Sequence, residues 1–393
     1  MSDESNLHTH VIVGASLAAA EGAEALGGGM NRLDTLRATG VSIWLDTLSR
    51  DLIATGQFER LRAERAVTGA TSNPTIFAKA ISGSERYDEQ LTSLLEAGVR
   101  DVREQFLELA LEDVRQAARI LRGAHERSGG ENGFVSLEVT PDVAYDSVAT
   151  VAQASDLWKR LGAPNVMIKV PATEAGVAAI EELTAAGVNV NVTLLFSLSR
   201  YAQVIEAYVS GLERRVKAGV PLGGIRSVAS FFVSRVDTKA DARLPAGSPL
   251  RGTVGIANAQ AAYQSYRAAF AGERWRRLEE LGAAPQRPLW ASTAPKSPSY
   301  RDVVYLERLA LPGSILTVPE PILDAFADHG EPRPAALSPE LRDELAAAAA
   351  AVDLDAITAE LEREGVEAFC DSYGELLAAI ERRTGRLQPT PTG

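Results

Sequence analysis

Lys169 is the residue of this sequence best suited to covalent chemistry, because it stands in an otherwise apolar run, NVMIKVPA, at positions 165–172. The run is short, rich in β-branched residues and followed by a Thr-Glu helix start, which is typical of a parallel strand buried on both faces. Burial disfavours the charged form of an amine, and a neutral amine is a nucleophile toward carbonyl carbon. A structural lysine, ion-paired in the core, is the alternative, and this strand alone does not decide between the two.

Further polar residues fall at the ends of other apolar runs. Side chains alternate between the two faces of a strand, and this rule sets Asp46, Glu138 and Lys169 opposite aliphatic neighbours. A strand-end asparagine is more often a helix cap, and Glu138 alone could be the ion-pair partner of the lysine. The same alternation, with one position just beyond a strand, adds these candidates: Asn73, Asn191, Thr193, Ser230, Phe232 and Arg235.

Taken together, these residues predict a catalytic site. Burying an unpaired polar group costs on the order of a few kcal/mol, so such a cluster is tolerated mainly where it performs chemistry. A lysine amine with carboxylates and no nearby cysteine suits Schiff-base formation, which turns a carbonyl into an electron sink for cleaving the neighbouring carbon–carbon bond. Metal chemistry is poorly supported, because no histidine falls on a predicted strand. The sequence contains no GxSxG motif, so serine hydrolase chemistry is not supported either.

The elements that must position these residues are eight short apolar runs separated by helical patterns. Such alternation is typical of a single (β/α)₈ TIM barrel, whose catalytic groups come from the C-terminal ends of the strands. A doubly wound open sheet is the competing architecture, but its GxGxxG and P-loop signals are missing. The predicted strands are residues 41–46, 66–73, 134–140, 165–171, 188–195, 225–234, 288–293 and 314–319.

Helices are predicted in the intervals and at the C-terminus. We expect two helices over residues 85–127, one helix over 254–281, and a final amphipathic helix over 353–383 that packs on the barrel. The barrel domain is predicted over residues 30–384. An ill-ordered extension over residues 1–29 and a flexible tail over 385–393 are predicted on either side of it.

The composition limits the possible partners and compartments. An apolar content of 46% and a charged content of 23% are those of an ordinary globular protein. The net charge of −12 argues against binding to nucleic acid or anionic membrane, so an anionic substrate needs a local basic cluster. The one cysteine, Cys370, allows no intrachain disulfide and is predicted to be a packing residue of the final helix. With no basic n-region and no apolar run of about 20 residues, the expected compartment is the cytoplasm.

From about Met30 to the final helix, the sequence resembles the transaldolases in the form found in actinobacteria. The resemblance rests on the order and spacing of SIWLDTLSRDLI, TGATSNPTIFAKAI, VSLEV, NVMIKVPAT, NVTLLFS, ASFFVSRVD and LWASTAPKSP. It implies a (β/α)₈ barrel without cofactor or metal. It also implies transfer of a dihydroxyacetone unit from sedoheptulose 7-phosphate to glyceraldehyde 3-phosphate in the pentose phosphate pathway. The products of that transfer are erythrose 4-phosphate and fructose 6-phosphate.

The resemblance also implies roles for the residues at the strand ends. Lys169 corresponds to the Schiff-base nucleophile, and Asp46 to the base that removes the proton of the C4 hydroxyl. Glu138 and Thr193 correspond to a pair that holds a catalytic water for proton transfer. The residues expected to line the substrate pocket and to bind its hydroxyls or phosphate are Asn73, Asn191, Ser230, Phe232 and Arg235.

The segment after the seventh strand departs from the family pattern. Many transaldolases have a Ser-Phe-Arg phosphate motif there, whereas this chain reads ASTAPKSP. We assign Ser292 and Lys296 to phosphate binding, although a lysine offers a point charge where arginine offers a fork.

Transaldolase is the leading hypothesis, and three alternatives are weighed against it, of which an aldolase is the nearest. A fructose 6-phosphate aldolase of the same superfamily would release free dihydroxyacetone. A silent barrel that serves as a scaffold would be expected to lack the lysine or a carboxylate, and a pyridoxal phosphate barrel would absorb near the visible. The expected partners are sugar phosphates, with no nucleic acid and no membrane, and the expected assembly is a monomer or a homodimer.

Overall fold

Eight parallel strands form a closed barrel in which each strand pairs with its neighbours in sequence, and β8 pairs with β1. The computed structural model describes residues 31–337 and 341–387. The strands are β1 (Ser42–Leu45), β2 (Val67–Ala70), β3 (Phe134–Glu138), β4 (Val166–Pro171), β5 (Val190–Leu195), β6 (Ser227–Phe232), β7 (Arg287–Ala291) and β8 (Ile315–Val318). The predicted strands and the (β/α)₈ TIM barrel are therefore confirmed, with β7 beginning one residue before its predicted range.

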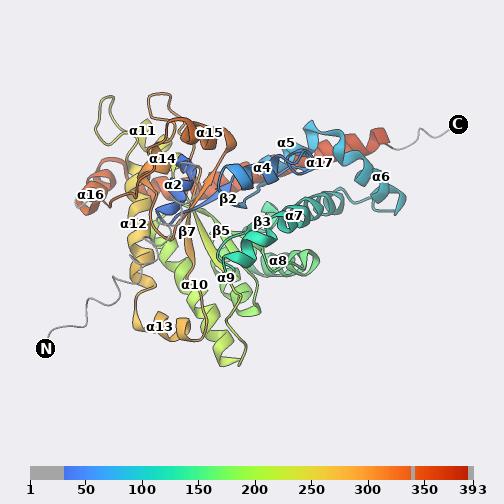
Figure 1. Ribbon diagram of the computed structural model, residues 1–393, viewed down its shortest axis with the longest axis horizontal. Coiled ribbons are helices and arrows are strands. Elements are labelled where there is room, and N and C mark those ends of the chain that lie inside the picture. The colour runs from blue at the N-terminus through green and yellow to red at the C-terminus, as the bar shows by residue number, and fades with distance from the viewer. Residues whose placement is uncertain (1–30, 338–340, 388–393) are drawn as a thin grey trace, which may run out of the picture.

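Helices surround the barrel and extend to one side of it (Figure 1). They are α2 (Arg32–Ala38), α3 (Arg50–Ala54), α4 (Gln57–Glu64), α5 (Pro74–Gly83), α6 (Asp88–Glu96), α7 (Val102–Arg127), α8 (Ser147–Leu161), α9 (Glu174–Ala186), α10 (Leu198–Lys217), α11 (Ser234–Arg243), α12 (Val254–Ala269), α13 (Glu273–Glu280), α14 (Val304–Arg308), α15 (Glu320–His329), α16 (Leu341–Val352) and α17 (Leu354–Leu387), with 3₁₀ turns η1 (Glu85–Tyr87) and η2 (Pro141–Val143). None of the helices in the described ranges has the length and apolar character needed to cross a bilayer.

Two predictions about the helices need correction. The single helix expected over 254–281 is in fact two helices. The first, α12, ends at Ala269, and Gly272, a poor helix former, is the N-cap of the second, α13. Cys370 was predicted to be a packing residue, but its side chain is exposed. Its neighbour Phe369 is the residue that α17 buries at this point. The predicted extension over residues 1–29 lies outside the described residues, as do residues 388–393 of the predicted tail. Residues 385–387, also predicted as part of that tail, belong instead to α17.

The final helix, α17, packs on the barrel as predicted. It lies beside α5 and also contacts α7, α11 and β5 (Figure 1). Phe369 of this helix reaches the cavity at the C-terminal ends of the strands. Apolar residues that recur along it at helical spacing are buried: Leu354, Ile357, Leu361, Val366, Phe369, Tyr373, Leu376 and Ile380.

Large side chains fill the barrel interior and separate its two ends. Trp44 of β1 is fully buried, and its ring lies 6.2 Å from that of Phe134 between centroids. Gly69 of β2 makes room for the indole, because a Cβ at this position would lie 2.6 Å from the ring atoms of Trp44. Leu289 and Ile315 belong to the same buried cluster. The interior is therefore a packed core and not a pore.

The turn between β4 and α9 is held by a close backbone approach. Thr173 caps α9 by accepting a hydrogen bond from the Gly176 N–H over 3.0 Å. A Cβ at Gly176 would lie 1.8 Å from the carbonyl oxygen of Pro171, the last residue of β4. The helix can therefore start this close to the strand that carries Lys169 only because residue 176 is glycine.

Gly176→Ala is expected to destabilise the protein by about 1–3 kcal/mol, because strand or helix must shift to admit the methyl group. The denaturant midpoint of unfolding measures the effect. Gly374→Ala is the matched control, since its Cβ would meet no heavy atom within 4 Å in α17. That variant is expected to gain about 0.5–1 kcal/mol. Equal midpoints for Gly176→Ala and the unmodified chain would contradict the packing described here.

Candidate active site

A cavity of about 380 Å³ opens at the C-terminal ends of the barrel strands. It brings together residues that are far apart in the sequence, as catalytic residues of such barrels are. Glu138 and Asn191 are absent from its lining, and each lies directly behind a lining residue. The predicted site residues that line it are Asp46, Asn73, Lys169, Thr193, Ser230, Phe232, Arg235, Ser292 and Lys296.

Lys169 lies at the centre of three aligned strands. The parallel register pairs it with Glu138 of β3 on one side and Asn191 of β5 on the other. The residue is 5% exposed, and its Nζ donates to the Ser72 carbonyl over 2.8 Å and to Glu138 Oε2 over 3.1 Å. The ion pair considered as an alternative is thus present, yet the same side chain lines the cavity. An amine in this position is both held in place and open to a small molecule.

Asp46 faces the same cavity from the end of β1. Its Oδ1 accepts a hydrogen bond from Thr71 Oγ1 over 3.0 Å, and its N–H donates to the Val318 carbonyl over 2.9 Å. Burial raises the pKa of the Asp46 carboxyl, and the positive charge of Lys169 opposes that rise. A carboxyl with a raised pKa beside an amine is suited to accept and return a proton.

Glu138 and Thr193 each bring an oxygen without a partner into the buried surroundings of Lys169. Among the described residues, neither Glu138 Oε1 nor Thr193 Oγ1 has a hydrogen-bond partner, and both atoms are buried. Burial raises the pKa of Glu138, which the charge and hydrogen bond of Lys169 oppose. Unpaired buried oxygens are costly, so their presence beside the lysine indicates a site for a further polar group.

The backbone at Thr193 is also irregular. The register between β5 and β6 shifts between Val192 and Leu195, and Leu194 has a φ of 53°. A non-glycine residue in this region is strained, and strain of this kind gathers at functional sites. Leu194 is held from outside by α17, where a Cβ at Gly365 would lie 2.9 Å from its Cδ2.

The two asparagines of the site hold different positions. Asn73 caps α5, with Oδ1 accepting from the Ile76 N–H over 2.9 Å, and its side chain also lines the cavity. Both the cap and the pocket position predicted for it are therefore present. Asn191 is fully buried, and its amide donates to Ser136 Oγ over 3.0 Å and accepts from Ser230 Oγ over 2.7 Å. Asn191 therefore does not line the cavity itself but holds the hydroxyl of Ser230, which does.

The positive charge expected for an anionic substrate gathers on one side of the cavity. Arg235 lies in the first turn of α11 with its Cζ 5.3 Å from the centroid of the Phe232 ring. Burial lowers the pKa of its guanidinium, which the charges of Asp46 and Glu138 oppose. Ser292, with a φ of 56°, lies 2.8 Å from Ser234 between hydroxyl oxygens, and Lys296 follows it on the same loop.

The lining includes residues that the sequence did not single out. Lys79 of α5 adds a fourth cation to Lys169, Arg235 and Lys296. Phe369 comes from α17, and Thr317 of β8 lies 2.9 Å from Thr71 between hydroxyl oxygens. The alternation on β8 could have indicated Thr317 as an inward residue. Lys79 and Phe369 lie on helices, so strand alternation gives no signal for them.

The arrangement combines a reachable amine, carboxyls with raised pKa values, hydroxyl and amide groups, and a basic side. It is suited to a polyhydroxylated carbonyl compound that bears a phosphate or carboxylate. Among residues 31–337 and 341–387, no group of three or more His, Cys, Asp or Glu side chains is arranged to hold a metal ion.

Comparison with known proteins gives one family over most of the chain. A family described as Transaldolase/Fructose-6-phosphate aldolase matches residues 43–380. A protein of Frankia alni named Transaldolase is 47% identical over 365 residues, covering 91% of this chain and 98% of the relative. A Transaldolase of Saccharopolyspora erythraea is 48% identical over 362 residues, covering 90% and 98%. Transaldolase 1 of Streptomyces coelicolor is 47% identical over 359 residues, covering 89% and 94%.

Proposed function

The chain belongs to the transaldolase/fructose-6-phosphate aldolase family and acts as a transaldolase, and we propose that Lys169 forms the Schiff base with its ketose phosphate substrate. The observation that carries this proposal is the position of the Lys169 amine. It is buried, held by Glu138 and the Ser72 carbonyl, and reachable from the cavity. The substrates are sedoheptulose 7-phosphate and glyceraldehyde 3-phosphate, and the products are erythrose 4-phosphate and fructose 6-phosphate.

The reaction begins with attack of the lysine amine on the ketose carbonyl. The carbinolamine that forms must lose its hydroxyl as water, which requires a proton donor near the carbon. Glu138 and Thr193 serve this step through a water bound between them, and their unpaired buried oxygens support that role. The resulting iminium withdraws electrons from the neighbouring carbon–carbon bond.

Asp46 serves the cleavage step. Its carboxylate takes the proton of the C4 hydroxyl, the C3–C4 bond breaks, and its electron pair moves into the iminium to give an enamine. The aldose leaves, and the three-carbon unit stays on Lys169. When the acceptor aldehyde binds, the enamine carbon attacks it and Asp46 returns the proton to the new hydroxyl. The hydrogen bond from Thr71 keeps the carboxylate turned toward the cavity.

The remaining lining residues bind the substrate. Asn73 and Ser230 contact hydroxyls of the three-carbon unit, with Asn191 holding Ser230, and Phe232 covers one side of the pocket. Arg235, Ser292 and Lys296 bind the phosphate. The position of these three residues along one side of the cavity supports the assignment, because a phosphate needs convergent donors in an acidic protein.

Transfer and simple cleavage are distinguished by the acceptor. With fructose 6-phosphate alone, we expect the three-carbon unit to stay on Lys169 and free dihydroxyacetone to form at less than about 1% of the transfer rate. With erythrose 4-phosphate added, sedoheptulose 7-phosphate should appear at the full rate. The measurement is the release of dihydroxyacetone with and without acceptor. Comparable release in both cases would favour the fructose 6-phosphate aldolase alternative.

The remaining expectations about the protein are part of the proposal. Its partners are sugar phosphates, it binds neither nucleic acid nor membrane, and it works as a monomer or homodimer in the cytoplasm. The net charge of −12 supports the lack of affinity for nucleic acid and anionic membrane.

A further inference from the structure

A second cavity, of about 520 Å³, lies at the opposite end of the barrel from Lys169. The strands contribute residues from their N-terminal ends, such as Ser42, Phe134, Ser227 and Arg287, each the first residue of its strand. We call this the basal cavity. The packed interior around Trp44 separates it from the cavity at the other end. Its volume is in the range of pockets that hold small organic molecules, about 300–1,000 Å³.

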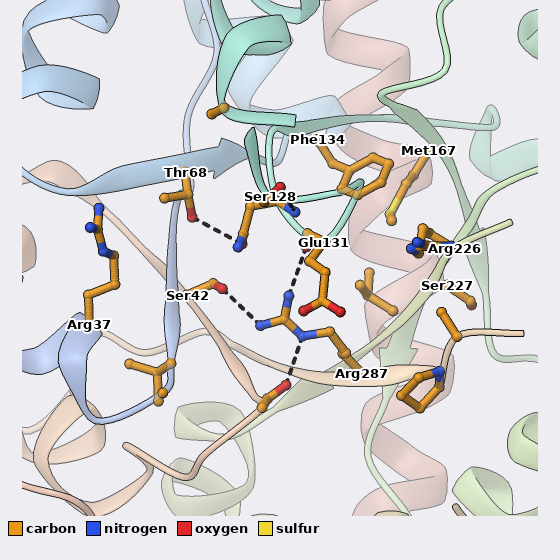
Figure 2. A pocket seen from close by; sticks show the side chains of 18 of the residues that line it. Arg37, Ser42, Thr68, Ser128, Glu131, Phe134, Met167, Arg226, Ser227 and Arg287 are labelled. Atoms are coloured by element: carbon orange, nitrogen blue, oxygen red, sulfur yellow. Dashed lines mark hydrogen bonds between the residues drawn. The ribbon is translucent and has the colours of Figure 1, made fainter. Parts of the chain in front are cut away.

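The basal cavity is strongly basic. Four arginines line it, Arg37, Arg127, Arg226 and Arg287, with Glu131 as the one acidic residue of the lining. None of these arginines forms an ion pair with another residue in the described ranges. Figure 2 shows Arg37, Arg226 and Arg287 around the opening, with the Glu131 carboxylate between them. Such a concentration of unneutralised cations is unexpected in a chain with a net charge of −12.

Arg287 and Arg226 are fixed by neutral acceptors. Arg287 donates to Ser42 Oγ and the Gly313 carbonyl over 2.8 Å each, and to the Glu131 carbonyl over 2.9 Å (Figure 2). Arg226 donates to the carbonyls of Gly130 and Ile225 over 3.0 Å each. These bonds hold the two side chains in place without a hydrogen bond to a carboxylate, and the nearby charge of Glu131 offsets that of Arg287 only in part. Burial lowers the pKa of the Arg287 guanidinium, which reflects the cost of that arrangement.

Arg37 and Arg127 have no comparable role in the fold. Both are exposed, and neither side chain has a hydrogen-bond partner or ion pair within the described part of the chain. Each lies at the C-terminal end of its helix, α2 or α7, where a cation is favourable. That preference is weak for an exposed residue and does not require the two to border one cavity. Their common feature is that both add an exposed cation to the lining of the basal cavity.

The floor of the basal cavity is apolar. Phe134, Met167 and Val228 form it, each less than 3% exposed, and Tyr266 and Pro285 line the side. Figure 2 shows Phe134 and Met167 adjacent to one another above Glu131 and Arg226. A bare inorganic anion would leave this surface uncovered. A ligand with an uncharged, flat part beside its anionic part would use both surfaces.

We propose that the basal cavity binds a small phosphate ester that carries a planar organic group, a ligand of the nucleotide class. Arginine binds phosphate through paired N–H donors, which Arg37 and Arg127 offer at this opening. Arg226 and Arg287 already donate to carbonyls and to Ser42, so they add mainly positive charge toward a diphosphate. The planar group would lie against Phe134, Met167 and Val228, and the hydroxyls of Ser42 and Ser128 lie within the same lining. This binding is independent of the chemistry at Lys169.

The test is calorimetric titration of the full chain with ADP. The binding variant is Arg37→Glu with Arg127→Glu, which reverses two charges that have no hydrogen-bond or ion-pair partner within residues 31–337 and 341–387. The control variant is Arg276→Glu with Arg382→Glu, which changes the net charge equally at exposed positions outside the cavity. We expect ADP affinity to fall at least 50-fold in the binding variant and less than twofold in the control. Transaldolase turnover is expected to be unchanged in both.

Two further probes identify the parts of the ligand. Ribose 5-phosphate lacks the planar group and adenosine lacks the phosphate, and each is expected to bind at least tenfold more weakly than ADP. Arg127→Gln alone, expected to weaken ADP binding about fivefold, replaces the double variant if that variant does not fold. The proposal is overturned if ADP shows no saturable binding at about 1 mM, a level that would reveal even weak complexes. Equal ADP affinity in the binding and control variants, or adenosine binding as tightly as ADP, would overturn it as well.

Discussion

Lys169→Met is expected to lower kcat by at least ~10⁴-fold, because the covalent route needs the amine and methionine has no nucleophile to replace it. The fold should survive the change. Methionine has a similar length and suits a position that is 5% exposed. The Glu138 carboxyl left behind can take up a proton, since burial raises its pKa and the opposing charge of Lys169 is gone.

Borohydride reduction in the presence of fructose 6-phosphate tests the same residue directly. Reduction should fix the three-carbon unit on the peptide that contains Lys169 and should give no adduct in Lys169→Met. Lys217→Met, at the exposed end of α10, is the control that keeps both turnover and adduct. An adduct on another lysine, or turnover in Lys169→Met within about 100-fold of the unmodified chain, would refute the proposed nucleophile.

The barrel and the inward direction of its polar residues could be predicted because side chains alternate between the two faces of a strand, with a period of two residues. This period placed Asp46, Glu138 and Lys169 on inward faces from sequence alone. The closure of the barrel then aligned Glu138 beside Lys169 and Lys169 beside Asn191. Neighbouring strands in sequence are neighbours in such a barrel, so the alignment needed only the fold class and the register.

Depth within the site could not be predicted from the period. Alternation states that a residue points inward, but not whether another side chain stands between it and the cavity. Glu138 lies behind Lys169 and Asn191 behind Ser230, a distinction that depends on side-chain packing. The hydrogen bond that Lys169 donates to Ser72 goes to the backbone carbonyl. Because every residue has such a carbonyl, the sequence gives no sign of this contact.

Strand alternation also could not predict the residues that helices add to the active-site cavity, or the arginines that gather at the opposite end of the barrel. Lys79 and Phe369 reach the active-site cavity from α5 and α17, whose orientation follows from packing against each other. The four arginines of the basal cavity come from four separate segments of the chain. Each alone is typical of a surface arginine, and only the closed barrel brings them together.

Asp46→Asn is expected to lower kcat by ~10²–10⁴-fold, because the amide cannot take the proton of the C4 hydroxyl. Schiff-base formation does not use this carboxylate, so borohydride should still trap fructose 6-phosphate on Lys169. Loss of the adduct together with turnover would assign Asp46 to an earlier step. The unmodified enzyme should lose kcat as the pH falls through the raised pKa of Asp46, since only the ionised form acts as a base.

The same substitution should leave stability unchanged or raise it at neutral pH. Burial raises the folded-state pKa of Asp46 above the unfolded value, near 3.9. The folded chain therefore binds the proton more tightly than the unfolded chain. The contribution of this group to stability is then complete below the unfolded pKa and is lost as the pH rises through the folded value. Asparagine resembles the protonated form at every pH and avoids that loss.

Melting temperatures at several pH values measure this difference. Asp46→Asn should melt at a higher temperature than the unmodified enzyme at pH 8, and the gap should close as the pH approaches about 4. Asp371→Asn, at an exposed position of α17, should show no such gap. A lower melting temperature for Asp46→Asn at pH 8 would mean that Lys169 stabilises the carboxylate by more than burial destabilises it. In that case the raised pKa, and with it the predicted loss of activity on acidification, would be wrong.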